Sequence, residues 1–253
     1  MRVETLYRYP VKGLTAEALG EVRLAAGQAI PGDRMFALAQ GDAPFDEAAP
    51  AWLHKRHFGC LMANPRLAAV HASWDERRGM LLLRLPGEAP FAGDTTTPEG
   101  RSAIGARLAA ALGGEARGTP RLVHAPGHHF ADHPDRLISL INLASLAALE
   151  RAMGRALDPL RFRANLYFSG APAWAEQGWI GRLIEAGSAT LRVVEPIERC
   201  AATGVNPLTA ERDCDPVQGL RAAFGHAELG VYARVEQSGR IAVGDALVLR
   251  EEG

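Results

Sequence analysis

Short segments rich in branched and aromatic residues recur along this chain, and each is bounded by Gly, Pro or Asp. Such segments are typical of β-strands, because their side chains fit a pleated, half-buried surface and their boundaries supply turns. The clearest are VETLYRYPV, GEVRLA, RMFALAQ, LAAVHASW, MLLLRL, ANLYFSG, ATLRVVEPI, GVYARVEQ and DALVLR. They predict a mainly β fold with a few helices (α+β), in which the strands close into barrels.

The last of these segments show the clearest alternation. Val231, Ala233 and Val235 alternate with polar side chains up to the residues Ser238 and Gly239. A period of two places the apolar side chains on one face of a strand. We therefore expect a hairpin over this stretch, with one face toward water.

Three segments carry helix signals. The segment 101–114 ends at a double glycine, while 142–154 and 215–225 begin at the potential N-caps Asn142 and Asp215 and end at glycine. Polar N-caps and glycine ends satisfy the free backbone groups at helix termini. These segments predict the main helices.

A loop-rich section, EARGTPRLVHAPGHHFADHPDRL, separates a first half of strands from a second half that starts with the helix at Asn142. Turn-forming residues concentrate at domain boundaries. We expect two β-barrel-like domains, at 1–120 and 121–253.

Charge and hydropathy exclude several classes of protein. The 28 Lys and Arg residues balance 29 Asp and Glu residues, so nothing recruits nucleic acid or an anionic membrane surface. The N-terminus lacks the apolar core of a signal peptide, and no run approaches the roughly 18 apolar residues that span a bilayer. The sequence predicts a cytoplasmic protein with no membrane and no nucleic-acid partner.

The three cysteines, Cys60, Cys200 and Cys214, are an odd number at long spacings without a C-x-x-C pair. This spacing argues against a disulfide framework, a structural zinc site and an iron–sulfur cluster held by this chain. Four histidines lie within HAPGHHFADH, but Pro126 and Gly127 interrupt any helix there, so a solvated loop is the favoured interpretation over a metal site.

Several basic residues could bind an anion. Only two of the 28 basic residues are lysines, and one of them, Lys12, follows a Pro-initiated turn in YPVKG. It is either a solvated turn lysine or a cation presented to a phosphate. Arg34 in GDRM is expected just inside a strand, at a barrel mouth or reaching outward to water.

The segment PLRFRANLYFSG places Arg161, Arg163 and Asn165 at a spacing of two. If this segment is a strand, the three polar side chains share one face. They would then line a polar pocket or a wet edge.

Cys200, in VEPIERCAATGVNP, comes where an apolar run ends. It could be a small core residue, a nucleophile or a metal ligand. Arg199 would stabilise a thiolate and Glu198 would oppose it. No G-x-S-x-G segment supports serine triad chemistry.

Five segments together resemble a known family. YPVKG, GDRMF, FRANLYFSG, ERCAATGVNPLT and GVYARVEQSGRIAVGDAL are similar, in this order, to segments of the MOSC proteins, which join an N-terminal β-barrel domain to a MOSC domain. The family includes the mitochondrial amidoxime reducing component. The resemblance covers nearly the whole chain.

The resemblance implies a molybdenum cofactor, molybdopterin, whose metal is bound by Cys200. A soft thiolate would join the two soft dithiolene sulfurs of the pterin. The family pattern carries Lys12, Arg34 and Arg163 to the phosphate, Asn165 to the pterin or its phosphate, and Asp132 to the pterin. Arg199 completes the expected cofactor-binding residues, whereas Glu198 replaces the small hydroxyl residue that is frequent in the family.

The implied activity is an oxidoreductase that reduces N-oxygenated or N-hydroxylated small molecules. The electrons would come from a separate protein of the ferredoxin or flavoprotein reductase type, because no cluster-type cysteines are present here. The alternative is a non-catalytic carrier of the molybdenum cofactor or of sulfur. No pyridoxal phosphate is expected, since Lys55, in HKRH, lacks the context of a Schiff-base lysine.

Overall fold

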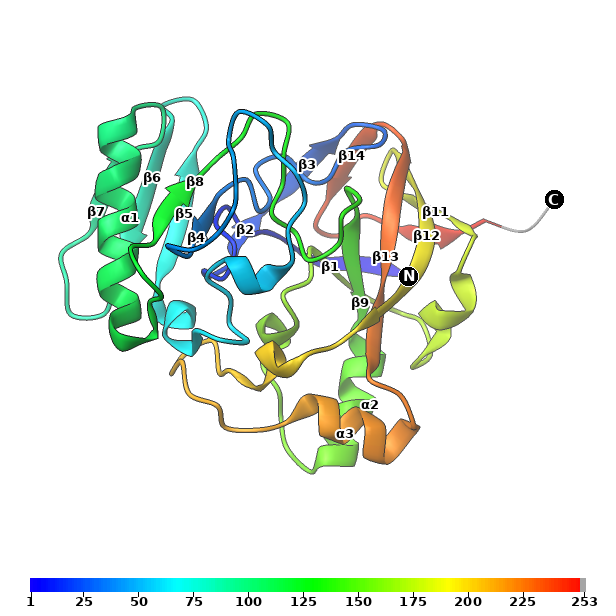
Figure 1. Ribbon diagram of the computed structural model, residues 1–253. Helices are drawn as coiled ribbons and strands as arrows, with labels where there is room; N and C mark the ends of the chain where they lie inside the picture. Colours follow the sequence, from blue (N-terminus) through cyan, green and yellow to red (C-terminus); the bar gives the residue numbers. More distant parts are fainter. Residues whose placement is uncertain (251–253) are drawn as a thin grey trace.

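Eight strands form one curled sheet that makes up the larger half of the molecule (Figure 1). The computed structural model describes residues 1–250, and in this part of the chain it is mainly β with three α-helices, which confirms the predicted fold class. The order across the sheet is β15 (Leu247–Leu249), β11 (Leu183–Ala186), β12 (Ala189–Glu198), β13 (Glu228–Gln237), β9 (Ile138–Asn142), β10 (Leu166–Ser169), β1 (Arg2–Arg8) and β2 (Glu17–Leu19).

Strands from the first part of the chain complete this sheet. β1 pairs antiparallel with β10, and β2 continues the sheet beyond β1. β3 (Glu21–Leu24) pairs with β14 (Gly239–Ala242), and β4 (Ala37–Ala39) pairs with β8 (Arg121–Val123). Hydrogen bonds thus cross residue 120 several times, and the division into domains at this residue stays a prediction.

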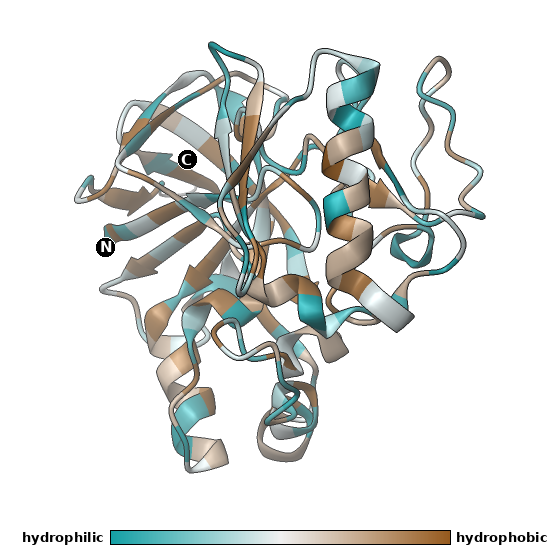
Figure 2. Cartoon of the chain, turned by 90° about the vertical axis from the view of Figure 1, so that its left-hand side faces the viewer, coloured by the Kyte–Doolittle hydropathy of each residue, from teal (hydrophilic) through white to brown (hydrophobic). Residues whose placement is uncertain are grey.

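The smaller half consists of a three-stranded sheet and a helix. The sheet contains β5 (His71–Asp75), β6 (Met80–Arg84) and β7 (Phe91–Asp94), and α1 (Pro98–Leu112) packs beside it (Figure 1). Hydrophobic and hydrophilic residues alternate along α1 (Figure 2), and its core side is formed by residues such as Ile104, Leu108 and Leu112. Through these buried residues the helix covers the apolar core of the smaller half.

Two shorter helices lie side by side at the lower end of the large sheet (Figure 1). The Asn142 side chain caps α2 (Leu143–Met153) by accepting from the Ala144 N–H at 3.1 Å. The Asp215 side chain caps α3 (Pro216–Phe224) by accepting from the Gln218 N–H at 2.9 Å. All three predicted helices are confirmed.

Each of the nine predicted segments contains a strand, but two expectations about the sheet need correction. The predicted hairpin around Ser238 is wrong, because β13 pairs with β12 and β9 while β14 leaves to pair with β3. The central strand β9 was not predicted. All five of its residues are buried, including the polar Ser139 and Asn142, so its sequence, ISLIN, lacks the alternation of a strand with one wet face.

A β-bulge in β13 shapes the end of β12. Pro196 pairs with Val231 and Glu198 pairs with Glu228. The segment 228–231 of β13 is therefore one residue longer than the segment 196–198 of β12 that it faces. Gly230 lies in this longer segment with a φ of +79°, a left-handed value that glycine adopts without strain. The bulge lies beside the point where β12 gives way to Arg199 and Cys200.

The bulge gives a first prediction. A Cβ atom added at Gly230 would lie 2.3 Å from the Leu140 carbonyl oxygen. We expect Gly230→Ala to lower the free energy of unfolding by the roughly 1–2 kcal/mol of left-handed strain plus roughly 1–3 kcal/mol of overpacking. Gly154→Ala is the matched control, because Gly154 also has a left-handed φ of +65° but nothing within 4 Å of an added Cβ. Equal losses in urea unfolding would show that the bulge tolerates a side chain.

Candidate cofactor site

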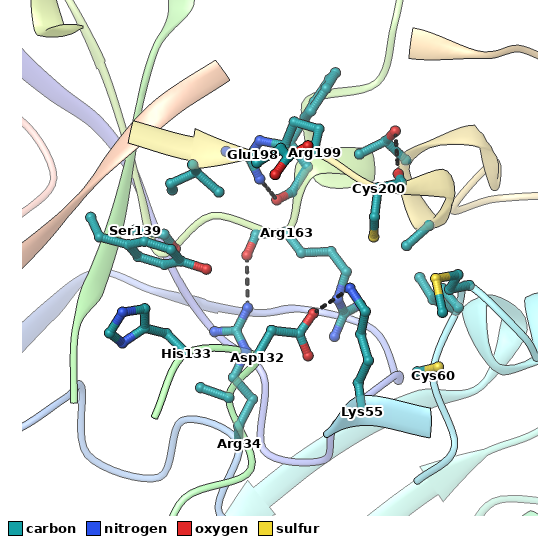
Figure 3. Close-up of a pocket in the computed structure, with 18 of the residues that line it drawn as sticks. Arg34, Lys55, Cys60, Asp132, His133, Ser139, Arg163, Glu198, Arg199 and Cys200 are labelled. Carbon is teal, nitrogen blue, oxygen red and sulfur yellow. Dashed lines mark hydrogen bonds and ion pairs between the residues drawn. The ribbon is translucent and has the colours of Figure 1, made fainter. Parts of the chain in front are cut away.

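A cavity of about 520 Å³ lies between segments from the first part of the chain, within residues 12–62, and segments from the second part, within residues 131–232. Both parts of the chain supply its walls, and Figure 3 shows their charged side chains directed toward the same space. Its volume is that of a site for a small organic ligand or cofactor. The lining includes all seven predicted site residues, which are Lys12, Arg34, Asp132, Arg163, Asn165, Arg199 and Cys200.

Cys200 lies at the end of β12, directly before the short 3₁₀ helix Ala201–Gly204. The residue is half-buried, and its sulfur faces the amino group of Lys55 (Figure 3). Burial lowers the pKa of Lys55, but its interactions, first with the Asp132 charge and then with the Cys200 side chain, outweigh burial and raise it overall. Cys200 therefore presents a thiol to the cavity beside a charged ammonium group.

Asp132 bridges the two lysines of the chain. Its carboxylate accepts from Lys12 Nζ and lies 3.5 Å from Lys55 Nζ. Burial alone would raise the pKa of Asp132, but the two lysines lower it well below its usual range. Asp132 is therefore a carboxylate at neutral pH, able to accept hydrogen bonds from N–H groups of a ligand.

Lys12 is not a solvated turn lysine. Its residue is 6% exposed, and its Nζ donates to the Phe130 carbonyl at 2.8 Å as well as to Asp132. Burial lowers its pKa more than the Asp132 charge raises it. The turn can pack closely because the next residue is Gly13, where an added Cβ would lie 3.0 Å from the Gly59 carbonyl oxygen.

Arg34 and Arg163 approach each other from segments that are far apart in the sequence. Arg34 Nη2 donates to the Arg163 carbonyl at 2.8 Å, and Arg163 Nη1 donates to the Leu14 carbonyl at 2.6 Å. Arg34 precedes β4 rather than lying in a strand as predicted. Both arginines have left-handed backbones, with φ of +46° and +53°. Such values are uncommon outside glycine and concentrate at functional sites.

The predicted shared strand face of Arg161, Arg163 and Asn165 is wrong, although all three line the cavity. Arg161 lies in the 3₁₀ helix Pro159–Phe162, and Arg163 ends that helix in a left-handed conformation. Pro159 and the Asp158 cap favour a helical turn over a strand here. The cavity therefore gathers these side chains through a turn, not through a period of two.

Arg161 ties the cavity to the loop after Cys200. Its guanidinium donates to the Gly204 carbonyl at 3.3 Å and to Asp213 Oδ2 at 2.7 Å. Arg161 Nε is buried without a hydrogen-bond partner. A buried donor without a partner is costly, and an acceptor on a bound ligand would remove that cost.

Two of the predicted site residues are already engaged with the protein. Arg199 donates from Nε to the Leu229 carbonyl at 2.8 Å and from Nη1 to the Phe162 carbonyl at 2.9 Å. Asn165 Oδ1 accepts from the hydroxyl of Ser139 at 2.8 Å. These hydrogen bonds fix Arg199 and Asn165 in the cavity wall, and each side chain keeps an N–H group that could donate to a ligand.

Some of the positive charges in the cavity wall are not paired with a carboxylate. Asp33 holds Arg34 at 2.5 Å, and Asp132 holds the lysines. Within residues 1–250, neither Arg163 nor Arg199 forms an ion pair. Burial lowers the pKa of Arg163 to about 10, so it remains charged at neutral pH. The buried Arg199 and the half-buried Arg163 therefore lack a carboxylate in direct contact.

Glu198 lies at the rim rather than inside. Its side chain is 74% exposed and lies 3.9 Å from Arg221. Exposure to water weakens the repulsion between this carboxylate and any phosphate bound in the cavity.

His133, from the histidine-rich loop, lines the cavity and lies 3.2 Å from Glu195. Among the described residues, no three His, Cys, Asp or Glu side chains are grouped so as to hold a metal ion. Nor does the described chain contain a helix long and apolar enough to cross a membrane.

Lys55 and Cys60 were not predicted from the sequence as site residues. Lys55 was set aside as part of a polar segment, and Cys60 was given no role, yet both line the cavity. A signal for Lys55 was present, because it is one of only two lysines among 28 basic residues and the other is Lys12. A chain that uses arginine almost everywhere keeps its two lysines at this cavity.

Comparison with known proteins agrees with this architecture. The family described as the MOSC N-terminal beta barrel domain matches residues 1–120, and the MOSC domain family matches residues 126–248. The crystal structure of the YuaD protein of Bacillus subtilis has a similar fold, with a TM-score of 0.51 and 17% identity, over 100% of this chain and 96% of that chain.

Curated relatives include mitochondrial amidoxime-reducing component 1 of Homo sapiens, 32% identical over 44% of this chain and 36% of the relative. Mitochondrial amidoxime reducing component 2 of Bos taurus is 29% identical over 43% of this chain and 35% of the relative. The matched region thus spans about a third of the length of these relatives. Because the two family matches together cover nearly the whole chain in order, the chain belongs to the MOSC proteins.

Proposed function

We propose that this protein binds a molybdenum cofactor in the cavity and reduces N-hydroxylated small molecules. The MOSC family and the names of the amidoxime-reducing relatives support this class of activity. The observation that carries the proposal is a pair of guanidinium groups without an ion pair, the half-buried Arg163 and the buried Arg199, in the same cavity as the Cys200 thiol. Such a wall is stabilised by an anionic ligand, and a thiol beside it can bind a soft metal.

The residues present fit this cofactor. Lys12, Arg34 and Arg163 would hold its phosphate, and the unpartnered Arg161 Nε offers one more donor. Asp132 would accept from N–H groups of the pterin, while Asn165 and Arg199 would brace the wall. Cys200 would bind molybdenum, which supplies two-electron redox chemistry when bound.

The proposed reaction takes two electrons and two protons. An N–OH bond of the substrate breaks, the nitrogen keeps its carbon substituent as an amine or amidine, and the oxygen leaves as water. We expect the substrate to enter on the side of the exposed Glu198, near Cys200. We expect a separate electron-transfer protein, of the ferredoxin or flavoprotein reductase type, to supply the electrons.

A carrier of the cofactor or of sulfur is the alternative. The half-buried Cys200 thiol beside the Lys55 ammonium would also suit a persulfide that is handed to another protein. Both functions need the same cavity, and only turnover separates them.

The metal ligand gives a second prediction. In protein purified from a host that makes the cofactor, Cys200→Ala should lose most of its molybdenum, because the thiolate ligand is gone. Cys214→Ser is the matched control, since Cys214 lies outside the cavity, beside α2 and α3. Elemental analysis checks both, and loss of metal in Cys214→Ser would identify a different ligand.

The phosphate contact gives a third prediction. Arg163→Gln should reduce the pterin retained per protein about tenfold or more, as expected for a lost charge-assisted bond of roughly 1.5–3 kcal/mol. Arg221→Gln is the control, because Arg221 is an exposed arginine near the rim. Fluorescence of the oxidised pterin measures both variants, and equal retention would argue against a phosphate at Arg163.

Turnover gives a fourth prediction. With a strong artificial reductant, the molybdenum-loaded protein should convert benzamidoxime or hydroxylaminopurine to the reduced product, detected by chromatography. A loaded protein that reduces none of several N-hydroxylated compounds would be assigned to the carrier class. A protein that holds neither molybdenum nor pterin would overturn both functions.

A further inference from the structure

Tyr9 lies against both arginines that converge on the cavity. The guanidinium carbon of Arg34 is 4.5 Å from the centre of the Tyr9 ring, and that of Arg163 is 4.3 Å from it. The side chain is fully buried, with 1% of the residue exposed. Both distances lie within the range in which a cation is attracted to the face of an aromatic ring.

The backbone of Tyr9 forms hydrogen bonds with Asp33 and Arg34, next to the guanidinium group that its ring contacts. The Tyr9 N–H donates to Asp33 Oδ1 at 2.8 Å, and the Arg34 N–H donates to the Tyr9 carbonyl at 2.7 Å. The Tyr9 hydroxyl donates to the Ala164 carbonyl at 3.2 Å, next to Arg163. The Tyr9 backbone thus binds the segment that contains Arg34, and the Tyr9 hydroxyl binds the segment that contains Arg163.

The two arginines also carry an unusual backbone. They are two of the four non-glycine residues with left-handed φ in residues 1–250. A left-handed conformation is unfavourable for arginine, so its neighbours must stabilise it. Both strained residues meet at the same aromatic ring.

Based on this geometry and on the proposed function, we infer that Tyr9 is a positioning residue that holds Arg34 and Arg163 for the cofactor phosphate. Arg34 is also paired with Asp33, whereas Tyr9 holds Arg163 without a neutralising carboxylate. A carboxylate would also hold a guanidinium, as Asp213 holds Arg161. However, a carboxylate cancels the charge that the ligand requires. The ring face and the Leu14 carbonyl hold Arg163 while contributing no net charge.

The ring itself stays neutral. Burial raises the pKa of Tyr9 to about 12, although the nearby arginines oppose this rise. A phenolate would pair with the guanidinium groups and compete with an anionic ligand.

The test measures how fast the pterin leaves the molybdenum-loaded protein. We expect Tyr9→Phe to release it at the wild-type rate, because the ring face remains, and Tyr9→Leu to release it about tenfold faster. Tyr7→Leu is the matched control. Tyr7 lies on β1, two residues before Tyr9, and its ring packs on that of Tyr167 with the ring centres 5.9 Å apart. The ring of Tyr9, not that of Tyr7, lies under Arg34 and Arg163, so the variant should release the pterin as wild type does.

A fluorination series keeps the test decisive even if Tyr9→Leu fails to fold. Phenylalanine, difluorophenylalanine and trifluorophenylalanine at position 9 have nearly the same shape but progressively weaker attraction for cations. Release should therefore become faster along the series. Equal release across it, or release from Tyr9→Phe as fast as from Tyr9→Leu, would overturn the role of the ring face.

The same experiment separates this inference from the proposed function. If wild type holds the pterin and the series is flat, only the positioning role of Tyr9 is overturned. If wild type holds no pterin, the proposed cofactor site is overturned and the role of Tyr9 with it.

Discussion

The antiparallel pairing of β1 with β10 is the constraint on which the cavity depends. Leu6 pairs with Leu166, and the Tyr7 N–H donates to the Asn165 carbonyl at 2.8 Å. This register brings the residues after β1 beside those before β10. Tyr9 and Lys12 thereby come close to Arg163, from which they are separated by some 150 positions in the chain. A shift of one residue in this register would turn the paired side chains of the shifted strand to the other face of the sheet and move Tyr9 and Lys12 relative to Arg163.

The cavity that results is a wall of cations held in two different ways. Carboxylates hold Lys12, Lys55, Arg34 and Arg161, whereas carbonyl oxygens and aromatic rings hold Arg163 and Arg199. The second arrangement fixes the direction of a guanidinium group but leaves its charge available. A bulge at Gly230 and the bonds of Arg199 fix the chain just before Cys200 on the opposite side. The wall is therefore suited to an anion whose other end reaches the thiol.

Local signals were sufficient for much of the fold. The helices at Asn142 and Asp215 were predicted because each cap is formed by residues close in sequence. The central strand β9 was missed because a strand buried on both faces has no alternation. The expected hairpin at Ser238 was wrong because β14 pairs with β3, more than 200 residues away, and such a pairing leaves no local signal.

For the site, the sequence predicted several of the residues that line the cavity but not their conformations. The family resemblance named seven residues, and the structure places all of them at one cavity. Their conformations were not predictable, since the left-handed turns at Arg34 and Arg163 depend on contacts from distant segments. Lys55 and Tyr9 were passed over because each reads locally as an ordinary loop or strand residue. Their roles appear only when Asp132 and the two arginines are brought against them.

The most direct measurement is X-ray absorption at the molybdenum edge of the protein purified from a host that makes the cofactor. The proposed site predicts three sulfur ligands in wild type, two from the dithiolene and one from Cys200, and the loss of one sulfur in Cys200→Ser. The same number of sulfur ligands in both proteins would contradict the assignment of Cys200. A wild-type protein without molybdenum would contradict the cofactor site itself.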